Sequence, residues 1–485
     1  MTTRRDLLRG GAALLAGAAL PAAAQAQQRA PLGFHNAPAA GLDREPMRLV
    51  QGRAPAGLSG TLFRNGPAQF RRGDATIGHW FDGDGFVRAF RISEGQCTLS
   101  GRFVDTVKRR RDAEAGTFVM PGFGTPAAPG APVSSPDDAN GASTALLSVQ
   151  DQLWALWEGG SPYAIDPSDL STRGPVTLRD DLAEMPFSAH PKVSPDGTIW
   201  NFGPGFGQPA AFLWALAPDG RVKASGLIKL PRASYLHDWA VTATKLILPL
   251  QPWVVGRYSP PFAQSLAWRP ELDLQVLVID KADFTKQKLY DLPAGAFFHT
   301  ADAYEEADGT IRFDLCLSEE PVLDADRGAS ILRGVPRTGP EVKMSMAVLR
   351  PDGSADLIKT PYTAEFPVID QRLRSQPRGD VYCVTEGAVR PPWGHPYNAL
   401  MRFNWQTGKR TSFDFGANTL AEEPIFVPKP GTADGGWLLA PTLNLKASAT
   451  QLHVFDAQRI NDGPLATWQS STPLPLSFHG LWVGA

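Results

Sequence analysis

Four short segments of this 485-residue chain each present a histidine in an apolar or aromatic setting. They hold His190, His237, His299 and His479, half of the eight histidines in the sequence. Neutral imidazole binds iron, copper, nickel and zinc, and its second ring nitrogen commonly donates to a carboxylate that fixes the ring. Any one such histidine alone is more commonly a satisfied core residue. Because the four are spread over about 290 positions, a local metal knuckle is excluded, and they form a site only if the fold brings them to one axis.

The first 26 residues have the composition of an export signal. Arg4 and Arg5 precede an apolar run from Gly10 to Leu20 and a small-x-small sequence at Ala24-Gln25-Ala26, a pattern typical of twin-arginine export. The run is too short to span a membrane. We expect a signal peptide over residues 1–26 and a periplasmic mature protein; the alternative is an amphipathic or disordered tail. Export of folded protein suits a chain loaded beforehand with a weakly binding metal such as Fe²⁺.

The net charge argues against a nucleic-acid-binding protein, and the cysteines argue against a disulfide-rich one. Residues 1–26 contain three Arg and one Asp, so removing them changes the formal net charge from −2 to −4. A mildly acidic chain without a basic block is not suited to binding nucleic acid. The cysteines are an odd number and lie far apart in strand-like stretches, so we expect buried thiols and no disulfide framework: Cys97, Cys316 and Cys383.

Residues 27–485 are predicted to form a single all-β domain. The 47 Gly and 44 Pro separate short strand-like runs such as Leu274–Ile279, and Asp-Gly turn signals recur, as at Asp196-Gly197 and Asp352-Gly353. The nearest candidate for a boundary, Met120–Pro136, is short, and one short helix is expected near Arg109–Gly116. Many hairpins in one undivided chain favour a large closed β architecture such as a propeller. The absence of a close internal sequence repeat counts against a simple repeat propeller.

The chain resembles the carotenoid cleavage oxygenases, iron enzymes that split a polyene double bond with O₂. The resemblance covers nearly all of the mature chain and rests on an ordered set of motifs: Leu62-Phe63-Arg64-Asn65-Gly66-Pro67, His79-Trp80-Phe81-Asp82-Gly83-Asp84-Gly85, Leu153-Trp154-Ala155-Leu156-Trp157-Glu158-Gly159-Gly160 and Phe478-His479-Gly480. It implies a seven-bladed β-propeller, a dome of loops and helices above it, and one Fe²⁺ per chain on the propeller axis.

The resemblance also implies which residues build the iron site. The four histidines would be the ligands. Three glutamates would stand behind them, Glu158 accepting from His237, Glu365 from His299 and Glu423 from His479, which leaves His190 without a carboxylate partner. Four imidazole ligands leave an open coordination position for O₂. Because these ligands are neutral, they do not reduce the charge of the metal, and the three carboxylates behind them offset it.

The substrate side of the resemblance implies an apolar tunnel. Its expected lining is Thr144, Trp157, Tyr235, Phe298 and Phe366, and aromatic walls suit a long flat polyene. A branch of the family that cleaves phenolic stilbenes has a Lys immediately before the first glutamate, where this chain has Trp157. We therefore expect cleavage of a carotenoid or apocarotenoid into two carbonyl products. The alternatives are a stilbene- or phenylpropene-cleaving dioxygenase and a non-enzymatic periplasmic binding propeller.

Delivery of a water-insoluble substrate implies contact with a membrane. Apolar residues at Thr117–Gly124 follow the cations Lys108-Arg109-Arg110-Arg111, and this region would lie near the tunnel mouth. One hypothesis is a peripheral patch that dips into a bilayer while the cations meet anionic headgroups. The alternative is a packed loop beside a solvated charge run. We expect the protein to be a monomer.

Overall fold

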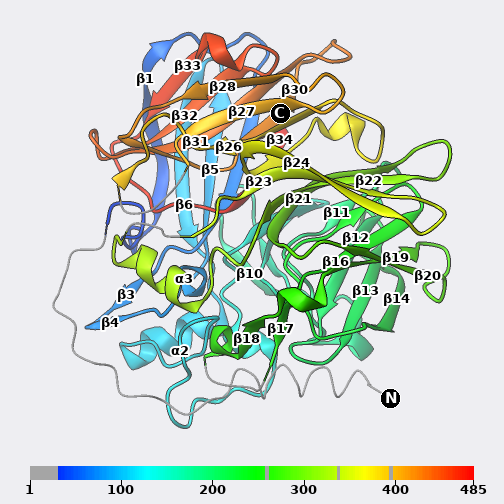
Figure 1. Ribbon diagram of the computed structural model, residues 1–485. Coiled ribbons are helices and arrows are strands. Elements are labelled where there is room, and N and C mark those ends of the chain that lie inside the picture. The colour runs from blue at the N-terminus through cyan, green and yellow to red at the C-terminus, as the bar shows by residue number, and fades with distance from the viewer. Residues whose placement is uncertain (1–30, 257–260, 336–338, 393–396) are drawn as a thin grey trace.

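The structure is a computed structural model that describes residues 31–256, 261–335, 339–392 and 397–485. Antiparallel β-strands make up most of it, and the described residues contain two short α-helices, α2 (Val107–Ala115) and α3 (Ala325–Leu332) (Figure 1). The prediction of an all-β protein is confirmed, and α2 coincides with the expected short helix. The predicted signal peptide lies outside the described residues.

Tight turns at Asp-Gly pairs join several of the strands, as the sequence predicts. Gly197, Gly220, Gly309 and Gly353 each follow an aspartate between two paired strands and have φ angles from +80° to +98°. This left-handed conformation is free of steric cost only for glycine. These turns therefore determine where the hairpins reverse.

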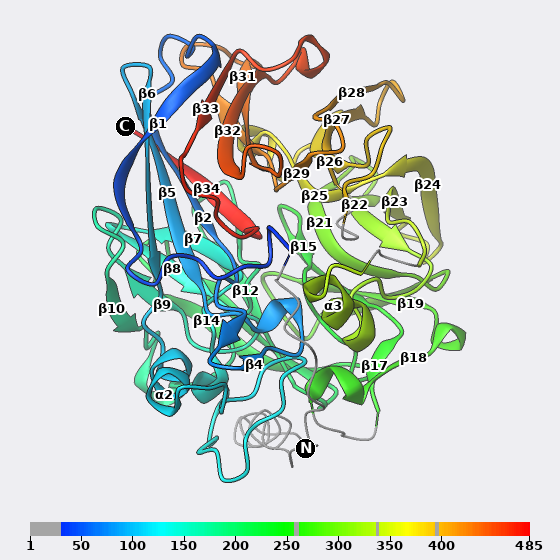
Figure 2. The ribbon, with the colours of Figure 1, turned by 90° about the vertical axis from the view of Figure 1, so that its left-hand side faces the viewer.

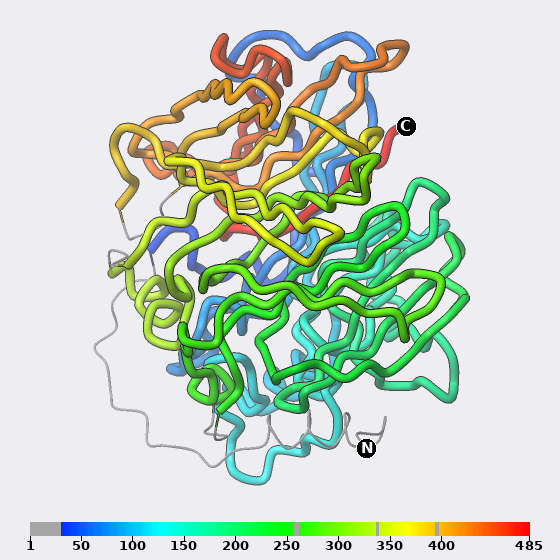
Figure 3. The backbone as a smooth tube through the Cα atoms, turned by 45° about the vertical axis from the view of Figure 1, so that its right-hand side comes forward, coloured from blue at the N-terminus to red at the C-terminus, as the bar shows by residue number. Residues whose placement is uncertain are grey.

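Five separate sheets have four antiparallel strands each, arranged in chain order (Figure 3). They are β7 (Ala145–Val149), β8 (Gln152–Leu156), β9 (Tyr163–Ile165), β10 (Thr172–Pro175); β11 (Lys192–Val193), β12 (Ile199–Pro204), β13 (Ala210–Leu216), β14 (Val222–Lys229); β15 (Ala240–Val241), β16 (Lys245–Leu250), β19 (Leu274–Asp280), β20 (Gln287–Leu292); β21 (Ala296–Glu305), β22 (Ile311–Ser318), β23 (Lys343–Leu349), β24 (Ala355–Thr363); and β25 (Glu365–Val368), β26 (Asp380–Thr385), β27 (Ala399–Asn404), β28 (Arg410–Asp414).

The remaining large sheet has ten strands and joins the two ends of the chain (Figure 2). It contains β1 (Leu42–Gly52), β2 (Gly60–Asn65), β5 (Phe86–Ser93), β6 (Gln96–Phe103), β29 (Thr419–Ala421), β30 (Ile425–Pro428), β31 (Gly436–Asn444), β32 (Ala449–Asp456), β33 (Ala466–Gln469) and β34 (His479–Gly484). The carboxyl-terminal strand β34 pairs with β2, so that Asn65 lies opposite His479. This pairing closes the ring of sheets.

The structure thus has a propeller arrangement with five separate blades and one continuous ten-stranded sheet, instead of the seven separate blades that were expected. The long strand β1 is the reason. Its first half pairs with β6 through Leu42 and Glu45–Met47, and its second half pairs with β33 through Arg48–Gly52. One strand therefore hydrogen-bonds to both of its neighbours, and no free edge separates the two groups of strands.

Short elements gather on one side of the propeller (Figures 1 and 2). They are α2, α3, the hairpin of β3 (Arg71–Arg72) and β4 (Ala75–Thr76), and the hairpin of β17 (Trp253–Val255) and β18 (Leu266–Trp268). The helix α2 is capped at its start by Thr106, whose hydroxyl accepts a hydrogen bond from the amide of Arg109, and at its end by Gly116 in the left-handed conformation. Residues of these elements and of the loops between them form part of the wall of an apolar pocket.

Candidate metal centre

The four histidines lie on or just before the innermost strands of their sheets. His190 lies two residues before β11, His237 lies three residues before β15, His299 lies within β21, and His479 opens β34. Their ligand atoms all lie within 4.8 Å of one another. The Nε2 atom of His237 is 3.1 Å from that of His190 and 3.3 Å from that of His299. Residues almost 300 positions apart in the sequence thus meet because each blade contributes its inner strand to one axis.

Three glutamates face the outer nitrogens of three of these rings. Nδ1 of His479 donates to Glu423 Oε1 at 2.8 Å, and Nδ1 of His299 is hydrogen-bonded to Glu365. Nδ1 of His237 lies 3.0 Å from Glu158 Oε1, without the alignment of a hydrogen bond. Since a carboxylate only accepts, these contacts place the proton on Nδ1 and leave the Nε2 lone pairs directed inward.

His190 differs from the other three histidines. Its Nδ1 atom is 3.7 Å from Asp238 Oδ1, too far for a hydrogen bond. Asp238 is already bound by Lys192 Nζ at 2.7 Å and by the amide and hydroxyl of Thr300. The nearest carboxylate to His190 is therefore held by other groups. Nothing in the sequence singles out Asp238 beyond its place directly after His237.

Burial and neighbouring charges set the pKa values in this cluster. Burial, together with the three other imidazoles, holds the pKa of His190 well below 6.5. Burial also lowers the pKa of His479, although Glu423 opposes the shift. The pKa of His299 is raised, because the effect of burial is outweighed by Glu365. The cluster therefore favours neutral ligand nitrogens at His190 and His479 near neutral pH.

A metal ion fits this donor set. Two nitrogen atoms that are each about 2.1 Å from one metal ion lie about 3.0 Å apart if the angle at the metal is 90°, and about 3.4 Å apart if it is tetrahedral. The two shortest Nε2 separations, 3.1 and 3.3 Å, fall in this interval. Converging lone pairs of neutral imidazoles repel one another unless a cation lies between them. The geometry and the protonation pattern thus both point to a metal site.

The buried side chain of Arg64 holds the Glu423 carboxylate in place. Its guanidinium donates to Glu423 Oε2 at 2.8 Å, to the carbonyl of Phe478 at 2.8 Å and to Ser477 Oγ at 3.0 Å. This arginine is fully buried, and Glu423 in turn orients His479. Sequence reasoning did not assign Arg64 a role, although it lies in the Leu62–Pro67 motif that carries the family resemblance.

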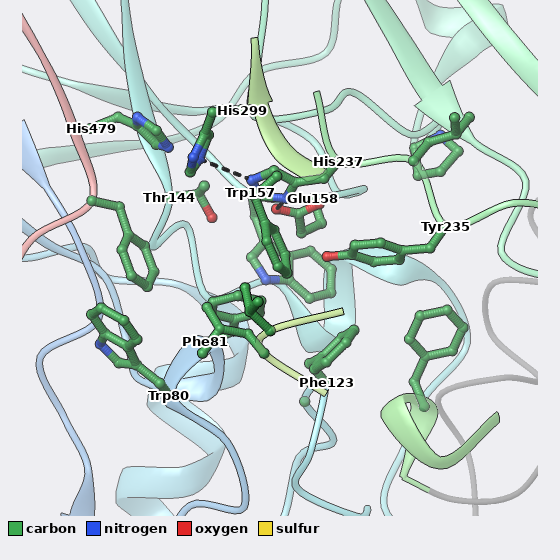
Figure 4. Close-up of a pocket in the computed structure, with 18 of the residues that line it drawn as sticks. Trp80, Phe81, Phe123, Thr144, Trp157, Glu158, Tyr235, His237, His299 and His479 are labelled. Carbon is green, nitrogen blue, oxygen red and sulfur yellow. Dashed lines mark hydrogen bonds and ion pairs between the residues drawn. The ribbon is translucent and has the colours of Figure 1, made fainter. Parts of the chain in front are cut away.

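An apolar pocket adjoins the histidines (Figure 4). All five residues predicted to line it do so. They are Thr144, Trp157, Tyr235, Phe298 and Phe366. Sequence reasoning missed further aromatic residues that line the same pocket: Trp80, Phe81, Phe123, Phe206, Phe262, Tyr397 and Phe478. Two signals could have found some of them, since Trp80-Phe81 lies in a motif that carries the family resemblance and Phe478 precedes His479. None of the described residues that line the pocket is Lys or Arg.

The Tyr235 hydroxyl points into this pocket between Trp157 and Glu158 (Figure 4). The ring is held by Trp253, 4.8 Å away between centroids, and lies nearly parallel to the His237 ring. The hydroxyl oxygen is buried and has no hydrogen-bond partner among the described residues. Burial raises the pKa of Tyr235 well above 10, so the group remains a hydrogen-bond donor. It is a polar contact available to a ligand in an otherwise apolar wall.

The segment proposed to contact a membrane packs against protein groups. The cations Lys108–Arg111 all pair with aspartates, at distances from 2.7 to 3.1 Å. Phe118 lies beneath the charged groups of Arg72 and Lys108, and Phe123 faces the pocket, 5.7 Å from Tyr235 between ring centroids. These contacts favour the packed-loop alternative for this segment, and membrane contact stays a prediction. In the described part of the chain, no helix has the length and apolar character needed to cross a membrane.

Comparison with known proteins establishes the family. The profile of the retinal pigment epithelial membrane protein family matches residues 36–484, so the chain belongs to this family. The apocarotenoid-15,15'-oxygenase of Synechocystis is 29% identical over 466 residues, covering 90% of this chain and 92% of that protein. The isoeugenol monooxygenase of Pseudomonas nitroreducens is 27% identical over 465 residues, covering 90% and 94%.

Solved structures show the same fold. A variant of the Synechocystis apocarotenoid oxygenase superposes with a TM-score of 0.82 at 27% identity, covering 93% of this chain and 98% of that one. The lignostilbene dioxygenase of Pseudomonas brassicacearum also gives 0.82, at 22% identity, covering 96% and 100%. The prediction that the chain is an enzyme of the oxygenase class is confirmed by the family and by its relatives.

Proposed function

We propose that the protein is a non-haem Fe(II)-dependent dioxygenase that cleaves a conjugated C=C bond of a carotenoid or apocarotenoid with O₂ and releases two carbonyl products. The observation that carries the proposal is the position of the four-histidine cluster at the end of an apolar, aromatic pocket. Histidines from four blades would hold the metal, and the pocket would bring a flat conjugated chain against it.

The residues of the centre would hold one Fe(II) per chain. When bound, the metal supplies the binding and activation of O₂. His190, His237, His299 and His479 provide its nitrogen ligands. Glu158, Glu365 and Glu423 keep three of the rings in one orientation and offset the charge of the ion. The aromatic wall excludes water from the reacting double bond, and Thr144 narrows the space beside the cluster.

The lining of the pocket supports an apolar substrate. Trp157 occupies the position before Glu158 and presents an indole face, and the described lining contains no cation that would stabilise a phenolate. The relative at 29% identity is named for an apocarotenoid. The alternative is a stilbene or a phenylpropene, which is favoured by the relatives named for isoeugenol and resveratrol, at 27% and 28% identity. The unpartnered Tyr235 hydroxyl suits a substrate of either kind that carries an oxygen.

We also infer that the ten-stranded sheet corresponds to two blades fused through β1, which would complete a seven-bladed ring. In support, seven strands line the cavity on the axis: β7, β11, β15, β21, β25, β30 and β34. The short elements on one side, with α2 and α3, would form the dome.

The proposal includes the cellular location of the protein. Export by the twin-arginine route, a periplasmic monomer over residues 27–485, and peripheral contact with a membrane are all consistent with the sequence. Replacing Arg4 and Arg5 with Lys should leave the precursor in the cytoplasm. Undiminished periplasmic protein would exclude this route.

Two measurements test the proposed function. Metal analysis of the purified protein should find about one iron per chain, and single turnover with isotopically labelled O₂ should place one labelled oxygen in each carbonyl product. Label in only one product would indicate a monooxygenase. Absence of a bound metal, with the polyene still bound, would instead favour a binding propeller.

A further inference from the structure

We propose that the cavity along the propeller axis is the route by which the divalent metal ion reaches the histidines, separate from the apolar pocket that takes the organic substrate. This inference rests on the metal site of the proposed function. The cavity, called the axial channel, is lined by the seven strands β7, β11, β15, β21, β25, β30 and β34.

The histidine cluster separates two cavities. His237 lines the apolar pocket, His190 lines the axial channel, and His299 and His479 line both. The axial channel has a volume of about 480 Å³, and the exposed residue Ser148 on β7 belongs to its wall. It therefore leads from the metal site towards solvent on the side away from α2 and α3. A metal ion therefore has two routes to the buried site, through the apolar pocket or through the axial channel, and the walls of these routes differ in chemistry.

The wall of the axial channel has apolar side chains too, but it carries more charged and polar groups than the wall of the pocket. It contains the side chains of Lys192, Asp238, Thr300, Asp302, Gln371 and Arg374. A divalent cation sheds its water shell only at a large cost in free energy, and an aromatic wall offers no replacement ligands. Carboxylate, hydroxyl and amide groups can replace water one at a time. The channel also stays open to a cation when a hydrophobic molecule fills the pocket.

A short segment covers the outer end of the channel. It consists of residues 371–375, which follow β25 and include the 3₁₀ turn Gln371–Leu373. The guanidinium of Arg374 donates to the carbonyl of Val193 on β11, the amide of Ser375 donates to Asp302 at 2.9 Å, and its hydroxyl donates to the carbonyl of Val241 at 3.4 Å. These three partners belong to three other sheets. The segment therefore spans the axis, and Arg374 is the side chain that ties it to the most distant of them.

This arrangement makes opposite predictions for two changes in the channel. Arg374→Ala removes the tie to Val193, so metal exchange should become faster. Ser148→Cys, modified with a bulky maleimide, places an obstacle in the channel, so exchange should become slower. The native cysteines do not interfere, because Cys97, Cys316 and Cys383 are buried and burial raises their thiol pKa values.

The experiment follows transfer of ferrous ion, without oxygen, from full-length loaded protein to an excess of a coloured chelator, and the reverse uptake by metal-free protein. The matched control is Ser234→Cys, which places the same label in the apolar pocket. We expect labelled Ser148→Cys to slow both directions by at least about tenfold, a barrier change of about 1.4 kcal/mol. Labelled Ser234→Cys should weaken binding of an apocarotenal, followed by quenching of tryptophan fluorescence, with unchanged metal exchange.

The outcomes distinguish failure of the axial route from failure of the metal site. Metal exchange that is slowed by the label at residue 234 and unaffected by the label at 148 would overturn the axial route while leaving the metal site intact. Failure of the unlabelled protein to bind ferrous ion would overturn the proposed function itself. Unlabelled Ser148→Cys should exchange metal at the original rate, which shows that the substitution alone leaves the fold unchanged.

Discussion

Replacing the buried Arg64 should destabilise the protein and loosen the metal site together. In Arg64→Met, the carboxylate of Glu423 loses a charged partner 2.8 Å away, and Glu422 loses one 3.6 Å away. Breaking a fully buried ion pair by removing one partner costs about 3–5 kcal/mol. Because Glu423 fixes the ring of His479, metal affinity should also fall by about 10–100-fold, as for other outer partners of metal ligands.

The size of the thermal shift follows from chain length. With an unfolding entropy of about 2.1 cal/mol/K per residue over 485 residues, a loss of about 3–5 kcal/mol lowers the Tm by about 3–5 °C. Calorimetry on metal-free protein measures this shift without the contribution of bound metal. Titration of ferrous ion with a competing chelator measures the affinity.

A double-mutant cycle shows whether the pair itself is responsible. Glu423→Gln removes the charge that Arg64 compensates, so the combined variant should lose about 1–3 kcal/mol less than the sum of the two single variants. Arg173→Met is the matched control, because Arg173 lies 2.7 Å from Asp166 at the surface and its loss should leave the Tm unchanged. Additive losses in the cycle would refute the view that Arg64 acts by compensating Glu423.

The remaining predictions concern the site and one buried histidine. His299→Ala should abolish metal binding and leave Glu365 without its ring partner, lowering stability by about 1–3 kcal/mol; retained iron with full turnover would exclude His299 as a ligand. Trp157→Lys should shift competition between an apocarotenal and a 4-hydroxystilbene towards the phenol, since a charge-assisted hydrogen bond contributes about 1.5–3 kcal/mol; preference of the unmodified enzyme for the stilbene would refute the polyene assignment. Tyr235→Phe should raise the KM for an oxygen-bearing substrate by about 2–10-fold, the equivalent of one hydrogen bond, and should leave iron content unchanged; an equal effect on a hydrocarbon analogue would contradict a direct contact. His453 is buried, and burial lowers its pKa to about 3, so the unfolded state takes up its proton first as the pH falls below about 6.5. Stability should fall between about pH 6.5 and pH 3, and His453→Gln should reduce that loss by about 2 kcal/mol at pH 5 in urea unfolding; an unchanged pH profile would show that another group is responsible.

The sequence alone was sufficient for the all-β fold class and for the four histidines that meet in one cluster. Glycine after aspartate determines a tight turn from local geometry, and short apolar runs between such turns favour strands. The apolar or aromatic neighbours of His190, His237, His299 and His479 singled them out, and the family resemblance implied that they act together as ligands. The turns and the choice of these histidines use information that lies within a few residues of each position, whereas the ligand role rests on the order of motifs along the whole chain.

The outer shell of the site was only partly predictable. Glu158, Glu365 and Glu423 were found from their motifs, and each faces the expected ring. Asp238 carried no such signal, and the motif that contains Arg64 did not indicate its role. Asp238 precedes β15 and His190 precedes β11, so they lie side by side only because these two sheets are neighbours in the ring. Arg64 reaches Glu423 only because β2 pairs with β34. Contacts of this kind depend on register between distant strands, which local sequence does not encode.

The arrangement of blades and cavities was decided by tertiary structure. Whether β1 belongs to one sheet or joins two depends on which edges remain unpaired after ring closure, and no pattern within Leu42–Gly52 distinguishes these outcomes. Phe123 illustrates the same limit. Its apolar segment beside four cations predicted either membrane contact or a packed loop, and the fold directs its ring into the pocket. Hydrophobicity determines that a side chain leaves water, but only the closed ring determines which surface receives it.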